Sequence, residues 1–153
     1  MKKIIFFSLS FIVLTAFAQN KAQPAPTTAA LPHIAITIGG FKGGDITSEI
    51  FSRIIDSTLT ARDEKGNKYY IVRFRSIYKF KSSYEDSETG QRKVTDDMRV
   101  NDFKDTDRMS ELWRQSIKDN IAKGDEMILD NIIVQLKNGS KIMAPVLSFK
   151  MIQ

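Results

Sequence analysis

The chain has 153 residues, a formal net charge of +5, one histidine and no cysteine. Without cysteine it can form neither a disulfide framework nor a thiol nucleophile, and with one histidine it cannot build the common nitrogen and sulfur metal sites. Basic and acidic residues interleave along most of the chain, which is typical of an ordinary solvated surface and disfavours nucleic-acid binding.

Residues 1–18 have the pattern of a cleavable export signal. Lys2 and Lys3 precede an apolar run that is too short to span a membrane comfortably, and the run ends in the small-residue pattern AFA. We therefore expect cleavage near Ala18, a mature form without a membrane span, and a periplasmic or secreted location. The loss of Lys2 and Lys3 lowers the formal charge from +5 to +3. An uncleaved membrane anchor is the alternative.

Residues 19–32 are rich in proline, alanine and threonine and predict an extended tether. The remainder, residues 33–153, is long enough to bury one hydrophobic core, so we expect a single domain there.

The first part of this domain alternates short patterns. Residues 34–38 place isoleucine at every second position and predict a strand. Four glycines then flank Phe41, among them Gly43 and Gly44, which indicates a tight bend or bulge. A phosphate-binding loop is disfavoured because its glycine and lysine spacing is missing.

Behind the glycines, residues 47–55 carry capping residues and then apolar residues at helical spacing, which predict a short amphipathic helix. An extended segment at 57–62 and a polar turn at 63–68 follow.

Residues 69–84 predict a long strand. Aromatic and apolar residues are expected on one face, namely Tyr70, Val72, Phe74, Tyr78 and Phe80. Basic residues alternate with them and are our candidate partner-binding side chains, namely Arg73, Arg75, Lys79 and Lys81. Because the two sets fall on opposite faces, a nucleic-acid strip is disfavoured and an antiparallel sheet with one wet face is favoured. We expect this strand to be a sheet edge and its charges to favour an acidic partner.

Residues 91–103 predict another strand, and acidic clusters flank it at 85–88 and 102–107. Both offer the oxygen ligands that calcium prefers, but neither has the EF-hand spacing. Acids near a helix start are also favoured by the helix dipole. We interpret both clusters as solvated charge, leave calcium binding open, and predict no metal site.

Residues 107–123 predict a second amphipathic helix, and Gly124 follows it where a left-handed residue commonly ends a helix. The apolar stripe consists of Met109, Leu112, Trp113, Ile117 and Ile121. We interpret Trp113 as a core residue that packs this helix on the sheet; a partner-binding anchor is the alternative.

Residues 124–152 predict a closing hairpin around Asn138 and Gly139, a pair that favours a two-residue type I′ turn. In that register Leu136 faces Lys141 and Ile128 faces Phe149. One face then collects apolar residues, namely Ile128, Ile132, Val134, Leu136, Met143, Leu147, Phe149 and Met151. Pro145 cannot donate to a ladder, which suggests that the last strand lies at an edge.

No catalytic set is found in the sequence. His33 lies beside the tether, and no serine has the G-x-S-x-G pattern around it. We therefore predict that the protein is not an enzyme and uses no cofactor. Two alternatives are a self-assembling envelope structural subunit and a small periplasmic hydrolase. The hydrolase would use a carboxylate pair from Asp96, Asp97, Asp102 and Asp105.

With these elements placed, the chain resembles the C-terminal domain of the GldM/PorM family, periplasmic components of the gliding-motility and type IX secretion apparatus. One block that carries the resemblance is GFKGGDI at 40–46, followed by the short helix. The other is 117–152, with its KG pair, its NGSK turn and Pro145 in the returning strand. With the strand at 69–81, the resemblance covers most of residues 34–152.

The resemblance implies a β-sandwich-like module that packs helices against its sheets and contacts outer-membrane or periplasmic proteins. Family members begin with a transmembrane helix and several further domains, whereas a cleavable signal and one domain are expected here, so a transenvelope role is not carried over.

We predict a mainly β (α+β) fold, an antiparallel β-sandwich-like domain with two packed amphipathic helices. We expect a non-catalytic exported protein-binding module that acts through a strand edge or loop rim, associated with gliding-motility or type IX secretion machinery. Whether it forms a homo-oligomer is left open.

Overall fold

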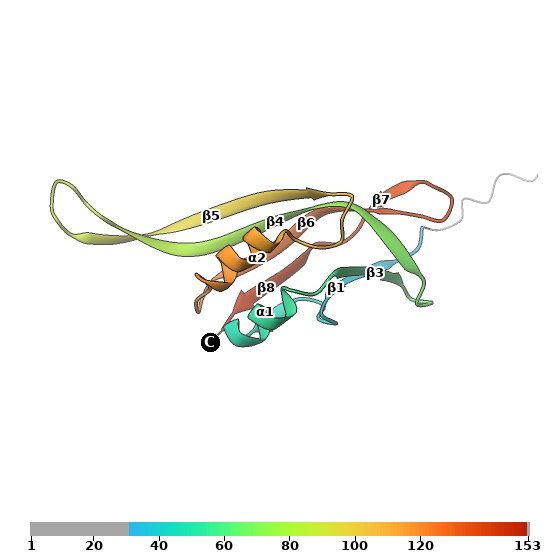
Figure 1. Ribbon diagram of the computed structural model, residues 1–153, viewed down its shortest axis with the longest axis horizontal. Coiled ribbons are helices and arrows are strands. Elements are labelled where there is room, and N and C mark those ends of the chain that lie inside the picture. The colour runs from blue at the N-terminus through green and yellow to red at the C-terminus, as the bar shows by residue number, and fades with distance from the viewer. Residues whose placement is uncertain (1–30, 153) are drawn as a thin grey trace, which may run out of the picture. The chain divides into compact units, whose positions relative to one another are not determined.

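The computed structural model describes residues 31–152, so the expected signal and most of the expected tether lie outside the described residues. This part of the chain is mostly β with two helices, as predicted (Figure 1). In chain order the elements are β1 (Ile34–Ile38), β2 (Gly44–Ile46), α1 (Ser48–Ile54), β3 (Leu59–Asp63), β4 (Lys68–Glu85), β5 (Arg92–Lys104), α2 (Glu111–Lys118), β6 (Glu126–Gln135), β7 (Lys141–Met143) and β8 (Leu147–Met151).

The strands form one curled sheet in the order β1-β3-β4-β6-β8-β2, with β5 also paired to β4 and β7 also paired to β6. All pairs are antiparallel except β2 with β8, which run parallel. The prediction of an antiparallel arrangement is therefore wrong for this pair, and the sheet is mixed. A parallel pair needs a long connection, and here nearly the whole domain separates the two strands.

The glycine bend predicted before the first helix is confirmed, and it makes the parallel pair possible. Gly43 has φ +95, and a Cβ atom at this residue would lie 2.5 Å from the backbone oxygen of Ser148 on β8. Gly44 has φ +97 but open space around its Cβ position. Glycine at 43 thus serves both the left-handed backbone and the close approach of β8.

The predicted closing hairpin exists, but its predicted register is wrong by one residue. Gln135, not Leu136, faces Lys141, and Met127, not Ile128, faces Phe149. Leu136 N–H donates to the Ser140 carbonyl at 2.8 Å, which leaves a three-residue loop. Within that loop only Gly139 has a positive φ, of 84°. The loop therefore matches a type I turn followed by a left-handed glycine, and not the type I′ turn.

A bulge in the middle of β6 changes which side chains face the core. Asn131 has φ 47 there, and the β4–β6 register is irregular between Ile71 and Arg75. Met127 and Leu129 are buried before the bulge, and Ile132 and Val134 are buried after it. Strict alternation along the whole strand, as the sequence suggested, is therefore wrong: Ile128 is only partly buried and Met143 is exposed.

Strand β4 changes its buried face at the same place, because Ile71 is buried on one side of the irregularity and Phe74, Ser76 and Tyr78 on the other. The predicted inward position of Tyr70 is wrong, since 53% of this residue is exposed.

The first helix is confirmed, with Thr47 as its N-cap and Phe51 in ring contact with Phe149 of β8 at 5.3 Å between centroids. The second helix is shorter than predicted. It ends at Lys118 with Asp119 as its C-cap, so the predicted C-terminal role of Gly124 is wrong. Instead, Gly124 N–H donates to the Met151 carbonyl at 2.8 Å, in the turn before β6.

Strand β4 is not the sheet edge that the sequence suggested. From Arg73 to Lys79 it is paired with β5 on one side and β6 on the other. Pro145 lies between β7 and β8, and β8 is paired with both β6 and β2, so the edge expected for the last strand is also wrong. The long edge belongs to β5, which within residues 31–152 is paired with β4 alone.

Candidate functional site

The four candidate basic residues share one face of the sheet. Arg73, Arg75, Lys79 and Lys81 lie at alternate positions of β4. Their partners on β5 are Lys104, Asp102, Met98 and Asp96. Directly opposite residues of an antiparallel pair share a face. Val100 and Val94 of β5 therefore lie on this open face too, and the face mixes charged and apolar side chains.

Most of these basic side chains already have a neighbour of their own chain. Arg75 contacts Asp102 at 3.0 Å, and Lys79 lies 3.7 Å from Glu126. Arg73 donates to Asn131 at 3.2 Å. The hydrogen bond between these two side chains raises the pKa of Arg75 and lowers the pKa of Asp102. The face therefore alternates in charge and is not a basic patch.

The hydrogen-bond pattern shows which backbone groups of β5 point outward. Asp105 N–H donates to the Val72 carbonyl at one end of the β4–β5 ladder, and Asp86 N–H donates to the Gln91 carbonyl at the other. The register between these pairs is continuous, so hydrogen-bonded pairs recur at every second residue. The β5 residues that point their N–H and C=O groups away from β4 are Val94, Asp96, Met98, Val100 and Asp102.

Two of these outward groups are capped by neighbouring side chains. Met98 N–H donates to Asp97 Oδ1 at 2.7 Å, and Thr95 Oγ1 donates to the Asp96 carbonyl at 3.4 Å. The stretch around Val100 has no such cap among the described residues. Three outward residues also expose large apolar side chains: Val94 by 66%, Met98 by 62% and Val100 by 47%. A long, exposed and partly apolar edge is a template for pairing with another chain.

A groove of about 590 Å³ lies where β6 begins. It is lined by Lys79, Phe80, Lys81, Asp96, Asp97, Met98, Gly124 and Glu126. Beyond Lys79, which faces Glu126, no strand of the described residues pairs with β4 on the β6 side, and the β4–β5 hairpin continues as an arm (Figure 1). We call residues 80–97 the arm.

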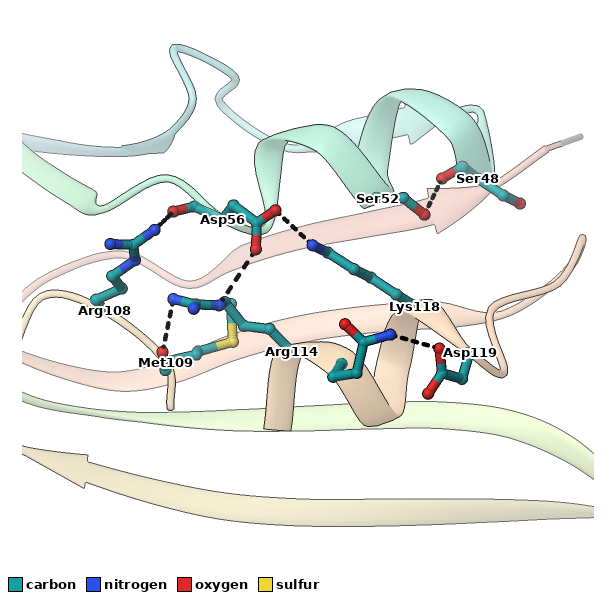
Figure 2. Close-up of polar contacts among 9 residues, drawn as sticks. Ser48, Ser52, Asp56, Arg108, Met109, Arg114, Lys118 and Asp119 are labelled. Carbon is teal, nitrogen blue, oxygen red and sulfur yellow. Dashed lines mark hydrogen bonds and ion pairs between the residues drawn. The ribbon is translucent and has the colours of Figure 1, made fainter. Parts of the chain in front are cut away.

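A second polar cluster joins the ends of the two helices. The Asp56 carboxylate accepts a hydrogen bond from Lys118 Nζ and lies 3.3 Å from Arg114 Nε, which is an ion pair without hydrogen-bond geometry (Figure 2). Arg108 donates to the Asp56 carbonyl. Arg114 is largely buried, and its Nη1 donates to the Met109 carbonyl at 3.1 Å. These contacts join the residues after α1 to α2, so the cluster stabilises the fold.

The core side of β4 carries a buried polar cluster. Tyr78 donates to Asp125, and Trp113 Nε1 donates to Ser76 Oγ at 2.9 Å. Trp113 is partly buried against the core, which agrees with its predicted core position. Burial, and then the hydrogen bond to Asp125, raises the pKa of Tyr78. These hydrogen bonds pair polar groups within the core, which is the arrangement expected of a packing role.

Within residues 31–152, no three histidine or acidic side chains converge in a way that could hold a metal ion. In the same range, no helix is long and apolar enough to cross a membrane.

Comparison with known proteins identifies no relative. No protein-family model matches the chain, and no curated protein is significantly similar to it. The resemblance to the GldM/PorM C-terminal domain therefore stays a prediction.

The sequence named β4 as the sheet edge, whereas in the described residues the long free edge belongs to β5. The β5 residues Val94, Met98 and Val100 were missed as surface features. An available signal was that they alternate with charged and polar residues in a strand that carries no other large apolar residue before Phe103.

Proposed function

We propose that this protein is a non-catalytic exported binding module, whose partner adds an extended segment to the free edge of β5. In the described part of the chain β5 is paired on one side only, over 13 residues, and this observation carries the proposal. Strand addition supplies affinity through main-chain hydrogen bonds and specificity through alternate side chains. The uncapped groups near Val100 and the apolar side chains of Met98 and Val100 are the contact points.

The partner segment is expected to be extended and apolar at alternate positions. Its apolar side chains would lie beside Met98 and Val100 on the open face, while charged residues would meet the alternating charges of Arg75, Asp102 and Lys79. The sequence favoured an acidic partner, but Arg75 and Lys79 already have acidic neighbours in their own chain, so acidity is not the feature proposed for the partner segment. An envelope protein of the gliding-motility or type IX secretion machinery is the proposed partner class, by the sequence resemblance alone.

The proposal is tested with a proline that blocks the edge but spares the fold. Val100→Pro removes an N–H that points away from β4, so the β4–β5 ladder loses no hydrogen bond. The variant protein and the native protein are compared for chemical cross-linking to envelope proteins of the producing cells. We expect a specific cross-linked protein that is lost with Val100→Pro.

The matched control is Val100→Thr, which keeps the N–H and the β-branched shape. It should retain the cross-linked protein. If the native chain captures no specific protein, or if Val100→Pro captures the same one equally well, the β5 edge is not the binding site.

A further inference from the structure

The other edge of the arm, on β4, has no side-chain caps from the described residues of the kind seen on β5. Hydrogen-bonded pairs with β5 fall on even-numbered β4 residues, so odd-numbered residues point their backbone groups toward β6. From Lys81 onward β6 is no longer there. Lys81, Ser83 and Glu85 therefore present N–H and C=O groups at an open edge. An isolated two-stranded hairpin is only marginally stable in water, so this arm would gain from a third strand.

The side chains at this edge are complementary to themselves. If two arms pair antiparallel with Ser83 opposite Ser83, Lys81 of one copy faces Glu85 of the other, twice. Within each copy, Lys81 faces Asp96 and Glu85 faces Arg92 on β5. The combined four-stranded sheet then carries two rows that alternate in sign: Asp96 and Lys81 of one copy, followed by Glu85 and Arg92 of the second. Opposite charges that face each other across strands stabilise a sheet.

The same pairing also brings the groove beside β6 into the contact. It places residue 86 of the second copy opposite Phe80, next to the position beside Lys79 that Glu126 occupies, so the acidic tip loop of each arm lies at the mouth of the other copy's groove. Lys81 lines that groove, and the exposed Glu88 belongs to the loop. On the opposite face, the exposed Tyr84 side chains of the two copies would lie diagonally across the new strand pair, within reach of aromatic side chains.

We propose that the β4 edge of the arm is a self-association site, at which a second copy of this chain pairs antiparallel through Lys81, Ser83 and Glu85. The contact involves only a short edge and one groove of each copy, so it is smaller than the about 1,000 Å² of a stable complex, and the dimer is a weak one. This site uses the edge opposite to that of the proposed β5 partner, so either proposal can fail without the other.

Charge reversal provides the test. Lys81→Glu places like charges opposite Glu85 in a homodimer, and Glu85→Lys places like charges opposite Lys81. In an equimolar mixture, one Lys81→Glu copy and one Glu85→Lys copy restore two opposite-charge pairs. We expect each variant alone to dimerise about tenfold more weakly than the native protein, and the mixture to recover most of that loss. Sedimentation velocity of the exported chain, over concentrations up to about 500 µM, measures this.

Two further variants keep the test decisive. Lys42→Glu changes the charge by the same amount at an exposed residue on the β1–β2 connection and should leave association unchanged. Ser83→Pro removes an outward N–H without loss of a β5 ladder bond, and should abolish the dimer while thermal unfolding stays cooperative. A native chain that stays monomeric throughout, or a mixture that associates no better than its components, would overturn the proposal.

Discussion

Tyr78 donates its phenolic hydrogen to Asp125 Oδ2 over 2.5 Å, and both residues are buried. The same carboxylate oxygen accepts the Ala122 N–H at 2.8 Å. Met151 N–H donates to the Asp125 carbonyl at 2.9 Å. Asp125 thus links the turn before β6 to the middle of β4 and to the end of β8. It is the only buried acidic residue in the described part of the chain.

Removal of the Tyr78 hydroxyl should therefore destabilise the fold. Tyr78→Phe leaves Asp125 buried with one hydrogen-bond donor fewer, which costs about 1–3 kcal/mol in the free energy of unfolding. Urea unfolding followed by circular dichroism measures it. Tyr84→Phe removes a hydroxyl from an exposed residue and is the control, with an expected change within about 0.5 kcal/mol.

The pH dependence of this difference follows from the raised pKa of Tyr78. Burial keeps the folded phenol protonated above the ordinary value of 10.0, at which the unfolded phenol ionises. The stabilisation is therefore complete below pH 10 and is lost as the pH rises beyond it. The difference in the free energy of unfolding between the native chain and Tyr78→Phe should become smaller in that alkaline range. A gap that widens there would contradict the assignment.

The carboxyl of Asp63 should titrate well below its usual range. The Asn67 side chain, and then the Tyr69 hydroxyl, donate hydrogen bonds to it and lower its pKa from 3.8 to about 2. Its contribution to stability is present above pH 3.8 and disappears as the pH falls toward 2. Carbon-detected NMR titration gives the value directly. Asn67→Ala should raise this pKa more than Tyr69→Phe does, and equal effects would contradict the order of causes.

Substitutions at the neighbouring residues Gly43 and Gly44 distinguish the stability cost of a strained backbone from the cost of a close contact. Gly43→Ala and Gly44→Ala both force alanine to a positive φ, but only the Cβ at 43 meets the Ser148 oxygen, at 2.5 Å. We expect Gly44→Ala to cost about 1–2 kcal/mol. Gly43→Ala should cost more by at least about 1 kcal/mol, because β8 must move. Chemical denaturation measures both, and equal losses would show that β8 yields without cost.

The Asp56 cluster should contribute to stability because Arg114 is largely buried (Figure 2). Asp56→Asn removes the carboxylate from both Arg114 and Lys118 and should cost about 1–3 kcal/mol, measured by urea unfolding. Asp119→Asn is the control, because Asp119 is exposed and accepts a hydrogen bond only from Gln115 in the described residues. It should change stability by less than about 0.5 kcal/mol. If Asp56→Asn lowers the free energy of unfolding no more than the control does, the cluster does not stabilise the fold.

The local elements of this protein were predictable from its residues. Alternation identified β1 and β4, the capping pattern identified α1, and the pair Asn138 and Gly139 marked the closing turn. These features depend on neighbours along the chain, so a window of a few residues contains the physical cause.

Tertiary structure decided which strand lies at the edge, the hairpin register and the parallel pairing of β2 with β8. The left-handed Asn131 shifts the buried face of β6 in the middle of the strand, and no alternation pattern contains that shift. Strand β4 resembles an edge because its basic residues face water, yet they lie on the open face of an interior strand. Face and edge are different directions in a sheet: side-chain alternation reports only the face, whereas the edge depends on which distant strand supplies the hydrogen bonds.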